Sequence, residues 1–113
     1  MSGAYAGLST HVLDTARGEP AAGVPVRLER ERDGGWEPVA TGTTDRDGRL
    51  RDWVPAHAWA AGAYRLVFDA VALLGPAAFF PEVAIVFRVT RPGRHHHIPL
   101  LLSPFGYTTY RGS

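Results

Sequence analysis

The feature that most constrains the fold of this chain is the alternation of apolar and charged side chains along short segments. Segment 24–32 is the clearest case, with apolar Val24, Val26 and Leu28 interleaved with charged Arg27, Glu29 and Glu31. Successive side chains of a β-strand point to opposite faces, so such a segment buries one face and leaves the other in water. The pattern predicts a half-buried strand over 24–32 whose far face, Glu29 included, meets solvent.

Other segments follow the same period, and turn residues separate them. Strands are predicted at 8–14, 37–44, 61–69, 82–90, 94–103 and 106–110. The Asp47-Gly48 pair marks a turn just before Arg49. Pro99 lies inside one of the strands. Because proline donates no ladder hydrogen bond, it needs a place where that strand has no neighbour on one side.

Segment 69–80 departs from this rhythm. Its Ala and Leu residues have a helical spacing that Gly75 and Pro76 close, so we expect a short helix of about two turns. Seven or eight short strands with frequent turn signals and one short helix predict an all-β fold, an antiparallel β-sandwich. The chain is 113 residues long and contains no repeat or linker, so a single domain over 1–113 is expected.

Composition and charge exclude several classes of function. The formal net charge is +1, so the basic face of a nucleic-acid-binding protein is not expected. No apolar run approaches the roughly 20 residues that span a bilayer, and the first residues lack the features of a secretory signal peptide. The chain has no cysteine, which rules out disulfides and thiolate chemistry. We therefore expect a cytoplasmic protein without a membrane or nucleic-acid partner.

Three adjacent histidines, His95 to His97, are the most conspicuous candidates for a functional site. On a strand, His95 and His97 point to one face and His96 to the other. Two imidazoles at this spacing can share a metal ion, but further ligands would have to come from His11, His57 or a carboxylate. A polar strand start with solvated imidazoles is the simpler explanation, so no metal is assigned.

His11 and Arg49 are weaker candidates when each is taken alone. His11 lies in segment 8–14 on the face opposite Thr10 and Val12, where a satisfied core histidine is the favoured interpretation. Arg49 follows a turn, where it would be a solvated cation. From the residues alone, the chain is a β-sandwich with several titratable groups.

The last segment, 103–113, has an unusual composition for the end of a chain. Chain ends are normally polar and poorly ordered. This segment carries Phe105, Tyr107 and Tyr110, followed by Arg111 and by Ser113 with its hydroxyl beside a free carboxylate. The composition predicts a docked segment with a function.

Four blocks of the sequence together resemble the 5-hydroxyisourate hydrolase family, the transthyretin-related enzymes of urate degradation. The blocks are 8–26, 43–50, 79–87 and 95–113, and the resemblance covers essentially the whole chain. The terminal YRGS is typical of the enzymes, and transthyretin itself lacks it. His96 is a departure, because the family usually has tyrosine there. Since this position faces away from His97, we expect the chemistry to survive the change.

The resemblance implies a transthyretin-like domain and assigns roles to particular residues. The family's catalytic set falls on His11, Arg49, His97 and Ser113, and its substrate-binding residues fall on His11, Arg49, Tyr110 and Arg111. It implies hydrolysis of the small molecule 5-hydroxyisourate to 2-oxo-4-hydroxy-4-carboxy-5-ureidoimidazoline, without a cofactor or a metal. It also implies a homotetramer, a dimer of dimers, with active sites at the dimer–dimer interface.

Such a hydrolysis needs a base that activates water and a cation where negative charge develops. His97 or His11 is the expected base, the other histidine orients the substrate or passes the proton, and Arg49 stabilises the anionic intermediate. Arg49 and partial burial should lower the pKa of the basic histidine below about 6.5. The alternative function is a non-catalytic carrier of transthyretin type, which shares the fold but has no need of these residues.

Overall fold

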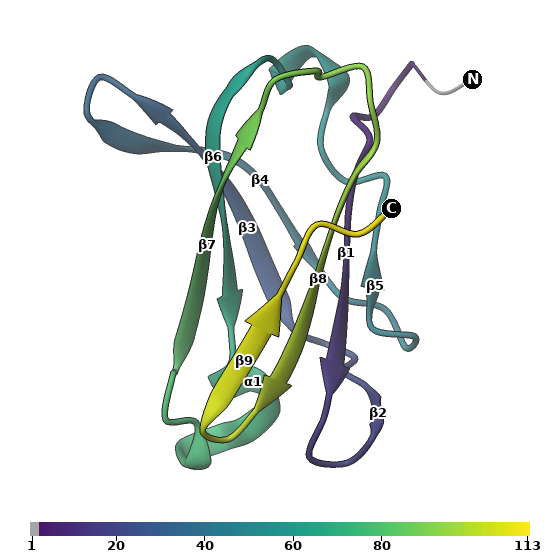
Figure 1. Ribbon diagram of the computed structural model, residues 1–113, viewed down its shortest axis with the longest axis vertical. Helices are drawn as coiled ribbons and strands as arrows, with labels where there is room; N and C mark the ends of the chain where they lie inside the picture. The colour runs from purple at the N-terminus through teal and green to yellow at the C-terminus, as the bar shows by residue number, and fades with distance from the viewer. Residues whose placement is uncertain (1–2) are drawn as a thin grey trace.

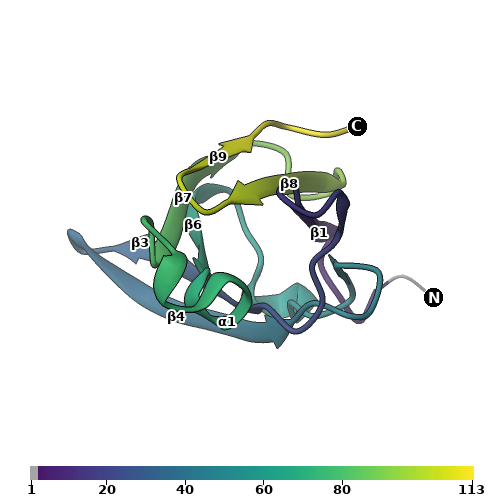
Figure 2. The same cartoon turned by 90° about the horizontal axis from the view of Figure 1, so that it is seen from below.

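The computed structural model describes residues 3–113 and contains two β-sheets packed face to face (Figures 1 and 2). Within these residues seven strands have four or more residues and two have only two. The strands are β1 (Leu8–Asp14), β2 (Glu19–Pro20), β3 (Pro25–Arg32), β4 (Gly35–Thr43), β5 (Arg49–Leu50), β6 (Gly62–Asp69), β7 (Glu82–Val89), β8 (His96–Ser103) and β9 (Gly106–Thr109). The predicted all-β sandwich is confirmed. Of the helices in residues 3–113, none has the length and apolar character needed to cross a membrane.

The first sheet has the order β2-β1-β8-β9, with β5 also paired to β1. β1 and β8 run parallel, from Leu8 opposite His96 to Asp14 opposite Leu102, whereas the other pairs of this sheet are antiparallel. The predicted antiparallel arrangement therefore has one exception at its centre. A parallel pair cannot be closed by a tight turn, and here the whole second sheet lies between the two strands in sequence.

The second sheet is antiparallel throughout, with the order β4-β3-β6-β7. The β3–β4 register shifts between Leu28 and Glu29. Glu29 points away from the core but is only 8% exposed, because Arg65 and Arg27 donate hydrogen bonds to its carboxylate. The prediction that Glu29 meets solvent is wrong. Its main partner comes from the neighbouring strand β6, which the pattern of segment 24–32 does not reveal.

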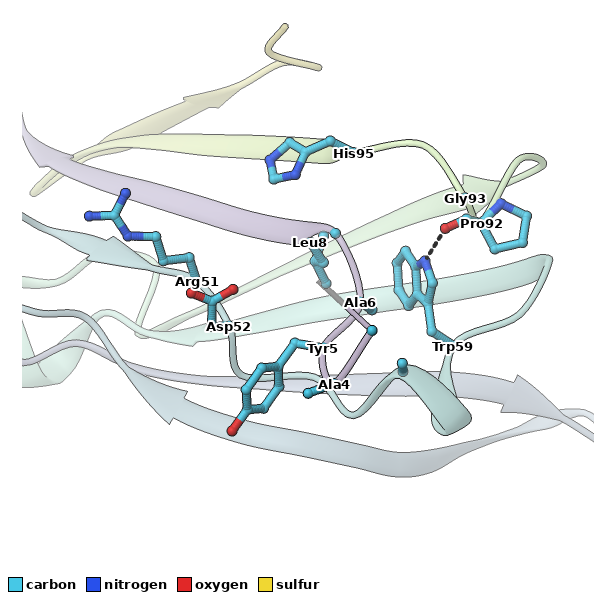
Figure 3. Close-up of a pocket in the computed structure, with 13 residues that line it drawn as sticks. Ala4, Tyr5, Ala6, Leu8, Arg51, Asp52, Trp59, Pro92, Gly93 and His95 are labelled. Atoms are coloured by element: carbon cyan, nitrogen blue, oxygen red, sulfur yellow. Dashed lines mark hydrogen bonds between the residues drawn. The ribbon is translucent and has the colours of Figure 1, made fainter. Parts of the chain in front are cut away.

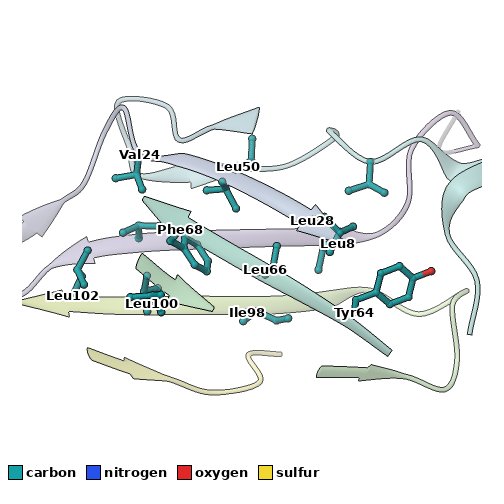
Figure 4. Packing of buried hydrophobic residues seen from close by; sticks show 14 of the residues in the cluster. Leu8, Val24, Leu28, Leu50, Tyr64, Leu66, Phe68, Ile98, Leu100 and Leu102 are labelled. Atoms are coloured by element: carbon teal, nitrogen blue, oxygen red, sulfur yellow. The ribbon is translucent and has the colours of Figure 1, made fainter. Parts of the chain in front are cut away.

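The hydrophobic core fills the space between the sheets (Figure 4). Alternate positions of the long strands supply side chains that are at most 2% exposed, among them Leu8, Val12, Val26, Leu28, Leu66, Phe68, Leu100 and Leu102. Thr10 is also buried, and its hydroxyl donates to the Ile98 carbonyl at 2.6 Å, so this polar group is satisfied. Because these residues of β1 and β8 point inward, the residues between them point to the outer face of the sheet.

The predicted helix is present at the lower end of the sandwich in Figure 1. Its α-helical part, α1, is only Val71–Leu74, and a 3₁₀ turn, η2 (Gly75–Ala77), continues it. Gly75 ends the α-helix with a φ of 62° and a ψ of −150°, a combination that glycine adopts without strain. The two predicted turns therefore exist, but only the first is α-helical. A second 3₁₀ turn, η1, covers Ala56–Ala58.

Pro99 lies where the ladder on one side of β8 is interrupted. The β8–β9 ladder ends at Leu100 opposite Thr109, and the next bridge on that side joins His97 to Gly112. The Pro99 carbonyl in the gap accepts a hydrogen bond from the Thr109 hydroxyl at 2.8 Å. Pro99 is paired with His11 of β1 on its other side, so the expectation that it has no neighbour on one side is confirmed for the β9 side.

Candidate active site

The candidate site lies on the outer face of the first sheet, over the first halves of β1 and β8. Ser9 and His11 point outward from β1, because the residues that alternate with them are buried. The parallel register places Ser9 opposite His97, and β5 pairs His11 with Arg49. Three segments that are far apart in the sequence thus bring two histidines and an arginine to one face.

A tight turn between β4 and β5 holds Arg49. The Asp45 carboxylate accepts backbone hydrogen bonds from Asp47 at 2.8 Å and Arg49 at 2.9 Å. The pKa of Asp45 lies below its ordinary value, mainly because its carboxylate accepts the hydrogen bond from the Arg49 backbone. The hydrogen bond from Asp47 and the charges of nearby arginines lower it further, and burial opposes them. Gly48 has a φ of 75°, and a Cβ there would lie 2.4 Å from the Val12 carbonyl oxygen. The predicted Asp-Gly turn is confirmed, and only glycine fits at its second position.

The same turn sets the orientation of His11. Its Nε2–H donates to the Asp47 carbonyl at 2.8 Å. Because a carbonyl oxygen only accepts, Nε2 must carry the proton, and Nδ1 is the unprotonated nitrogen of the neutral ring. His11 is half-buried on the outer face, so it is not the core histidine that its sequence position alone favoured.

His97 is half-buried and is linked to a second histidine through a serine hydroxyl. Ser9 Oγ lies 2.8 Å from His97 Nδ1 and 2.9 Å from His95 Nε2. The two rings are nearly parallel, with an interplanar angle of 22° and centroids 6.5 Å apart. His96 points inward instead and is 6% exposed, and its Nδ1–H donates to the Arg94 carbonyl at 2.9 Å. The predicted alternation of the three histidines is confirmed, but His96 is not solvated.

The environment of His97 keeps its ring neutral. Burial lowers the pKa of His97 below its ordinary value of about 6.5. The charge of Arg49, followed by His95 and His11, lowers it further, against an opposing hydrogen bond to the Ser9 backbone. The expectation of a lowered histidine pKa beside Arg49 is therefore confirmed for His97, whose ring can accept a proton near pH 7.

The C-terminal segment packs against the His97 ring and runs alongside β8 (Figure 1). The Gly112 N–H donates to the His97 carbonyl at 2.7 Å. A Cβ at Gly112 would lie 2.6 Å from His97 Cδ2, closer than carbon atoms approach. The predicted docking is confirmed for the backbone at Gly112, where the closeness of the imidazole requires glycine. The side chains of Phe105 and Tyr110, from which the docking was predicted, are 80% and 58% exposed.

Several of the predicted residues line one pocket of about 320 Å³. Its lining consists of Ser9, Thr10, Arg49, Leu50, Arg51, Asp52, His95, His97 and Ser113. Arg49, His97 and Ser113 are thus brought together from three segments. His11 lies beside this pocket, opposite Arg49 in the ladder, but does not line it.

Tyr110 and Arg111 lie elsewhere in the single chain. They line a pocket of about 240 Å³ together with His96 and residues of β7 and β8. They also border a hollow of about 560 Å³ at the chain end, which includes His95 and Ser113. Neither of these two pockets of residues 3–113 is lined by Arg49 or His97.

A larger pocket of about 750 Å³ adjoins the site and shares His95, Arg51 and Asp52 with it. Figure 3 shows His95 and Arg51 toward one end of this pocket and Trp59 toward the other. At that far end the Trp59 indole N–H donates to the Pro92 carbonyl at 3.1 Å. The titratable side chains gather at the His95 end, next to the smaller pocket.

A metal site at the histidine triplet is not favoured by these contacts. The Ser9 hydroxyl occupies the position between His95 and His97 and engages one nitrogen of each ring. Among residues 3–113, no three His, Cys, Asp or Glu side chains lie together in a way that could hold a metal ion. The arrangement of Ser9 between two imidazoles suits the movement of protons.

Ser9, Asp45 and Asp47 contribute to the site but were not among the predicted site residues. Ser9 precedes His11 by two residues and so shares its strand face, which is a signal the pattern contains. Asp45 precedes Arg49 by four residues in a turn, where aspartate often accepts backbone hydrogen bonds. The role of the Asp47 carbonyl has no signal in the sequence, because any residue carries this group.

A family model, relatives of known name and solved structures all place similar proteins in one family. The family described as the HIUase/Transthyretin family matches residues 8–112. A Salmonella dublin protein named 5-hydroxyisourate hydrolase is 45% identical over 109 residues, which cover 94% of this chain and 80% of that protein. The solved structure of Klebsiella pneumoniae 5-hydroxyisourate hydrolase matches with a TM-score of 0.80 at 38% identity, covering 94% of this chain and 98% of that one. Sea bream transthyretin in complex with thyroxine matches with a TM-score of 0.87 at 36% identity, covering 94% of each chain.

Proposed function

The chain belongs to the HIUase/transthyretin family, and from this premise we propose that it is an enzyme that hydrolyses 5-hydroxyisourate in urate degradation. The proposed reaction opens the six-membered ring at a cyclic amide bond and yields 2-oxo-4-hydroxy-4-carboxy-5-ureidoimidazoline. Relatives named 5-hydroxyisourate hydrolase in Salmonella and in Caulobacter vibrioides support this assignment. The proposal treats residues 1–113 as one transthyretin-like domain.

The observation that carries the proposal is the chemistry of one pocket. A neutral imidazole, a guanidinium and a serine hydroxyl, those of His97, Arg49 and Ser113, line the same hollow of about 320 Å³. That volume is at the lower end of the range of about 300–1,000 Å³ for small-molecule sites. A base and a cation that converge on a small pocket are what the attack of water on an amide carbonyl requires.

His97 is the proposed general base. Its Nδ1 is engaged by Ser9, so Nε2 is the nitrogen available to take a proton from water. His11 is less suited to this step, because its Nε2 is committed to the Asp47 carbonyl. We assign His11 the task of orienting the substrate, with the unprotonated Nδ1 accepting a hydrogen bond from a substrate N–H.

Arg49 and Ser113 are proposed to act on the reacting atoms. The planar guanidinium of Arg49 can bind the oxyanion of the tetrahedral intermediate with two N–H groups. The same positive charge contributes to the lowered pKa of His97, so one residue both stabilises the intermediate and keeps the base unprotonated. The Ser113 hydroxyl is proposed to position the attacking water.

Tyr110 and Arg111 are proposed to bind substrate only in the assembled protein. We propose a homotetramer, a dimer of dimers, in which a second chain covers the outer face of the first sheet. Tyr110 is 58% exposed, and its pocket lies apart from Arg49 within one chain, so a contribution across an interface is the role open to it. β9 and β7 are edge strands of the first and second sheet. In a lone chain their outer N–H and C=O groups would have no ladder partner, and pairing with a second chain would satisfy them.

The proposal is tested by following the ultraviolet decay of 5-hydroxyisourate that urate oxidase produces from urate. The purified protein is compared with His97→Ala and with a sample that lacks the protein, because the substrate also decays unaided. We expect acceleration by the wild type and a loss of about 10²–10⁴-fold in the variant. A folded wild-type protein that leaves the decay rate at background would refute the enzyme assignment.

A transthyretin-type carrier is the alternative, and the match to a thyroxine-bound transthyretin is the observation behind it. The polar lining of the pocket argues against it, because Arg49, Arg51, Asp52, His95 and His97 suit a small polar substrate better than an apolar ligand. Binding of thyroxine by calorimetry, without any acceleration of 5-hydroxyisourate decay, would favour the carrier.

A further inference from the structure

We propose that Ser9 and His95 form a proton relay behind His97, through which the positive charge created by water attack moves from His97 to His95. This inference rests on the proposed function, in which His97 is the general base. Two contacts carry it, because Ser9 Oγ lies 2.8 Å from His97 Nδ1 and 2.9 Å from His95 Nε2. A hydroxyl has one proton, so it links two ring nitrogens by donating to one and accepting from the other.

The direction of this chain follows from the nitrogen that must stay free. For His97 Nε2 to accept a proton, the neutral ring carries its own proton on Nδ1 and donates it to Ser9 Oγ. The Ser9 hydroxyl then donates to His95 Nε2, and His95 carries its proton on Nδ1. A Cβ at Gly7 would lie 3.4 Å from that nitrogen, so the glycine leaves this side of the His95 ring open, and the hydrogen-bond contact of the ring is with Ser9.

The proton balance closes over the two steps of hydrolysis. In the first step water bonds to the amide carbon and gives one proton to His97 Nε2. The Nδ1 proton of His97 passes to Ser9 Oγ, and the Ser9 hydroxyl proton passes to His95 Nε2, so that the His95 ring becomes an imidazolium. In the second step the C–N bond breaks, His97 Nε2–H protonates the leaving nitrogen, and both relay protons return.

The electrostatics of the site favour a positive charge on His95 over one on His97. A cation on His97 would lie beside Arg49, whose charge already disfavours protonation of that ring. His95 is exposed and lines both the 320 Å³ and the 750 Å³ pockets, where water screens a charge far better than in the protein interior. Its charged neighbours in these two pockets are Arg49, Arg51 and Asp52, and Arg94 and Arg111 line the 560 Å³ hollow with it (Figure 3 shows Arg51 and Asp52). Among these groups, the Asp52 carboxylate is the one that can offset the new cation.

The tautomer of His97 tests the relay without any activity measurement. Long-range ¹H–¹⁵N spectra of the wild-type protein at a pH where His97 is neutral distinguish a protonated Nδ1 from a protonated Nε2. We expect the Nδ1–H form in the wild type and a shift toward Nε2–H in Ser9→Ala. A wild-type His97 that carries its proton on Nε2 would overturn the proposed direction of transfer.

Kinetics test the transfer itself. Loss of the relay hydroxyl in Ser9→Ala should lower kcat by about 10–100-fold while KM changes by less than about twofold. Ser9→Thr keeps a hydroxyl and should recover most of kcat. His95→Ala should lower kcat by about tenfold, whereas the matched control His57→Ala, also an exposed histidine, should leave it unchanged. Equal kcat values for His95→Ala and His57→Ala would overturn the relay.

Chemical rescue separates proton transfer from simple support of the ring. Free imidazole in the buffer should raise the rate of His95→Ala in proportion to its concentration, because it can take the proton from Ser9. The rate of His57→Ala should not respond, and a His95→Ala rate that also fails to respond would refute the relay. A wild type with the expected tautomer but no hydrolysis would instead refute the proposed function, so the two failures are distinguishable.

Discussion

Substitution of Gly112 by alanine tests whether the C-terminal segment sets the position of the catalytic imidazole. The new Cβ would lie 2.6 Å from His97 Cδ2 and 3.3 Å from Cγ. Carbon atoms pack at about 3.5–4.0 Å, so the ring and the segment must separate by about 1 Å. A misplacement of about 1 Å can lower a rate by about 10²-fold. We therefore expect kcat/KM of Gly112→Ala to fall by about 10–100-fold.

The fold should survive this change. Gly112 is not among the residues with positive φ, so alanine is compatible with its backbone. Replacing a glycine at such a position restricts the unfolded chain and stabilises by about 0.4–1 kcal/mol, which offsets part of the strain. Gly35→Ala is the matched control, because a Cβ at Gly35, in the β3–β4 hairpin, would have only the Arg32 carbonyl oxygen nearby, at 3.9 Å.

The assay compares the three proteins in 5-hydroxyisourate decay and in thermal unfolding. The expected result is a selective loss of kcat/KM in Gly112→Ala, with Tm within a few degrees of the wild type and with Gly35→Ala fully active. If Gly112→Ala keeps its activity within about twofold, the close approach of the tail to His97 does not control catalysis. A large fall in Tm would show that the segment stabilises the fold rather than only the site.

Three further predictions concern other parts of the molecule. The pKa of His97 lies below about 6.5, so kcat/KM should be constant above that pH and decline as the pH falls through the lowered pKa. A pH–rate profile that is flat from about pH 5 to 8 would argue against a histidine base. Asp45→Ala removes the acceptor of the Arg49 backbone N–H, so kcat/KM should fall further than in Asp45→Asn, which keeps one acceptor oxygen; equal losses in the two variants would contradict this. Burial raises the pKa of Glu29, but the hydrogen bonds and charges of Arg65 and Arg27 outweigh it and leave that pKa below the ordinary value. Its contribution to stability is therefore present above about pH 4.5 and lost as the pH falls further. Because Gln keeps the shape but loses the charge-assisted hydrogen bonds, urea unfolding should find Glu29→Gln less stable by about 2 kcal/mol.

The sequence by itself determined the strands and the faces of most of their residues. Alternation along a strand is a local property, because the backbone turns each side chain to the opposite face from the last. It therefore separated inward His96 from outward His95 and His97, and the Asp47-Gly48 pair located the turn that presents Arg49. The resemblance to a family added the assignment of particular residues to a site, which the pattern alone could not supply.

The tertiary structure decided which strands are neighbours, because that choice depends on contacts between distant segments. The parallel pairing of β1 with β8 brings Ser9 between two histidines, and neither segment contains a signal for the other. The burial of Glu29 likewise depends on Arg65 of the adjacent strand. The close approach of Gly112 to His97 needs the chain end to return alongside β8. The two-residue period of a strand determines the face to which a side chain points. Only the packing of the whole chain determines which residues that side chain contacts.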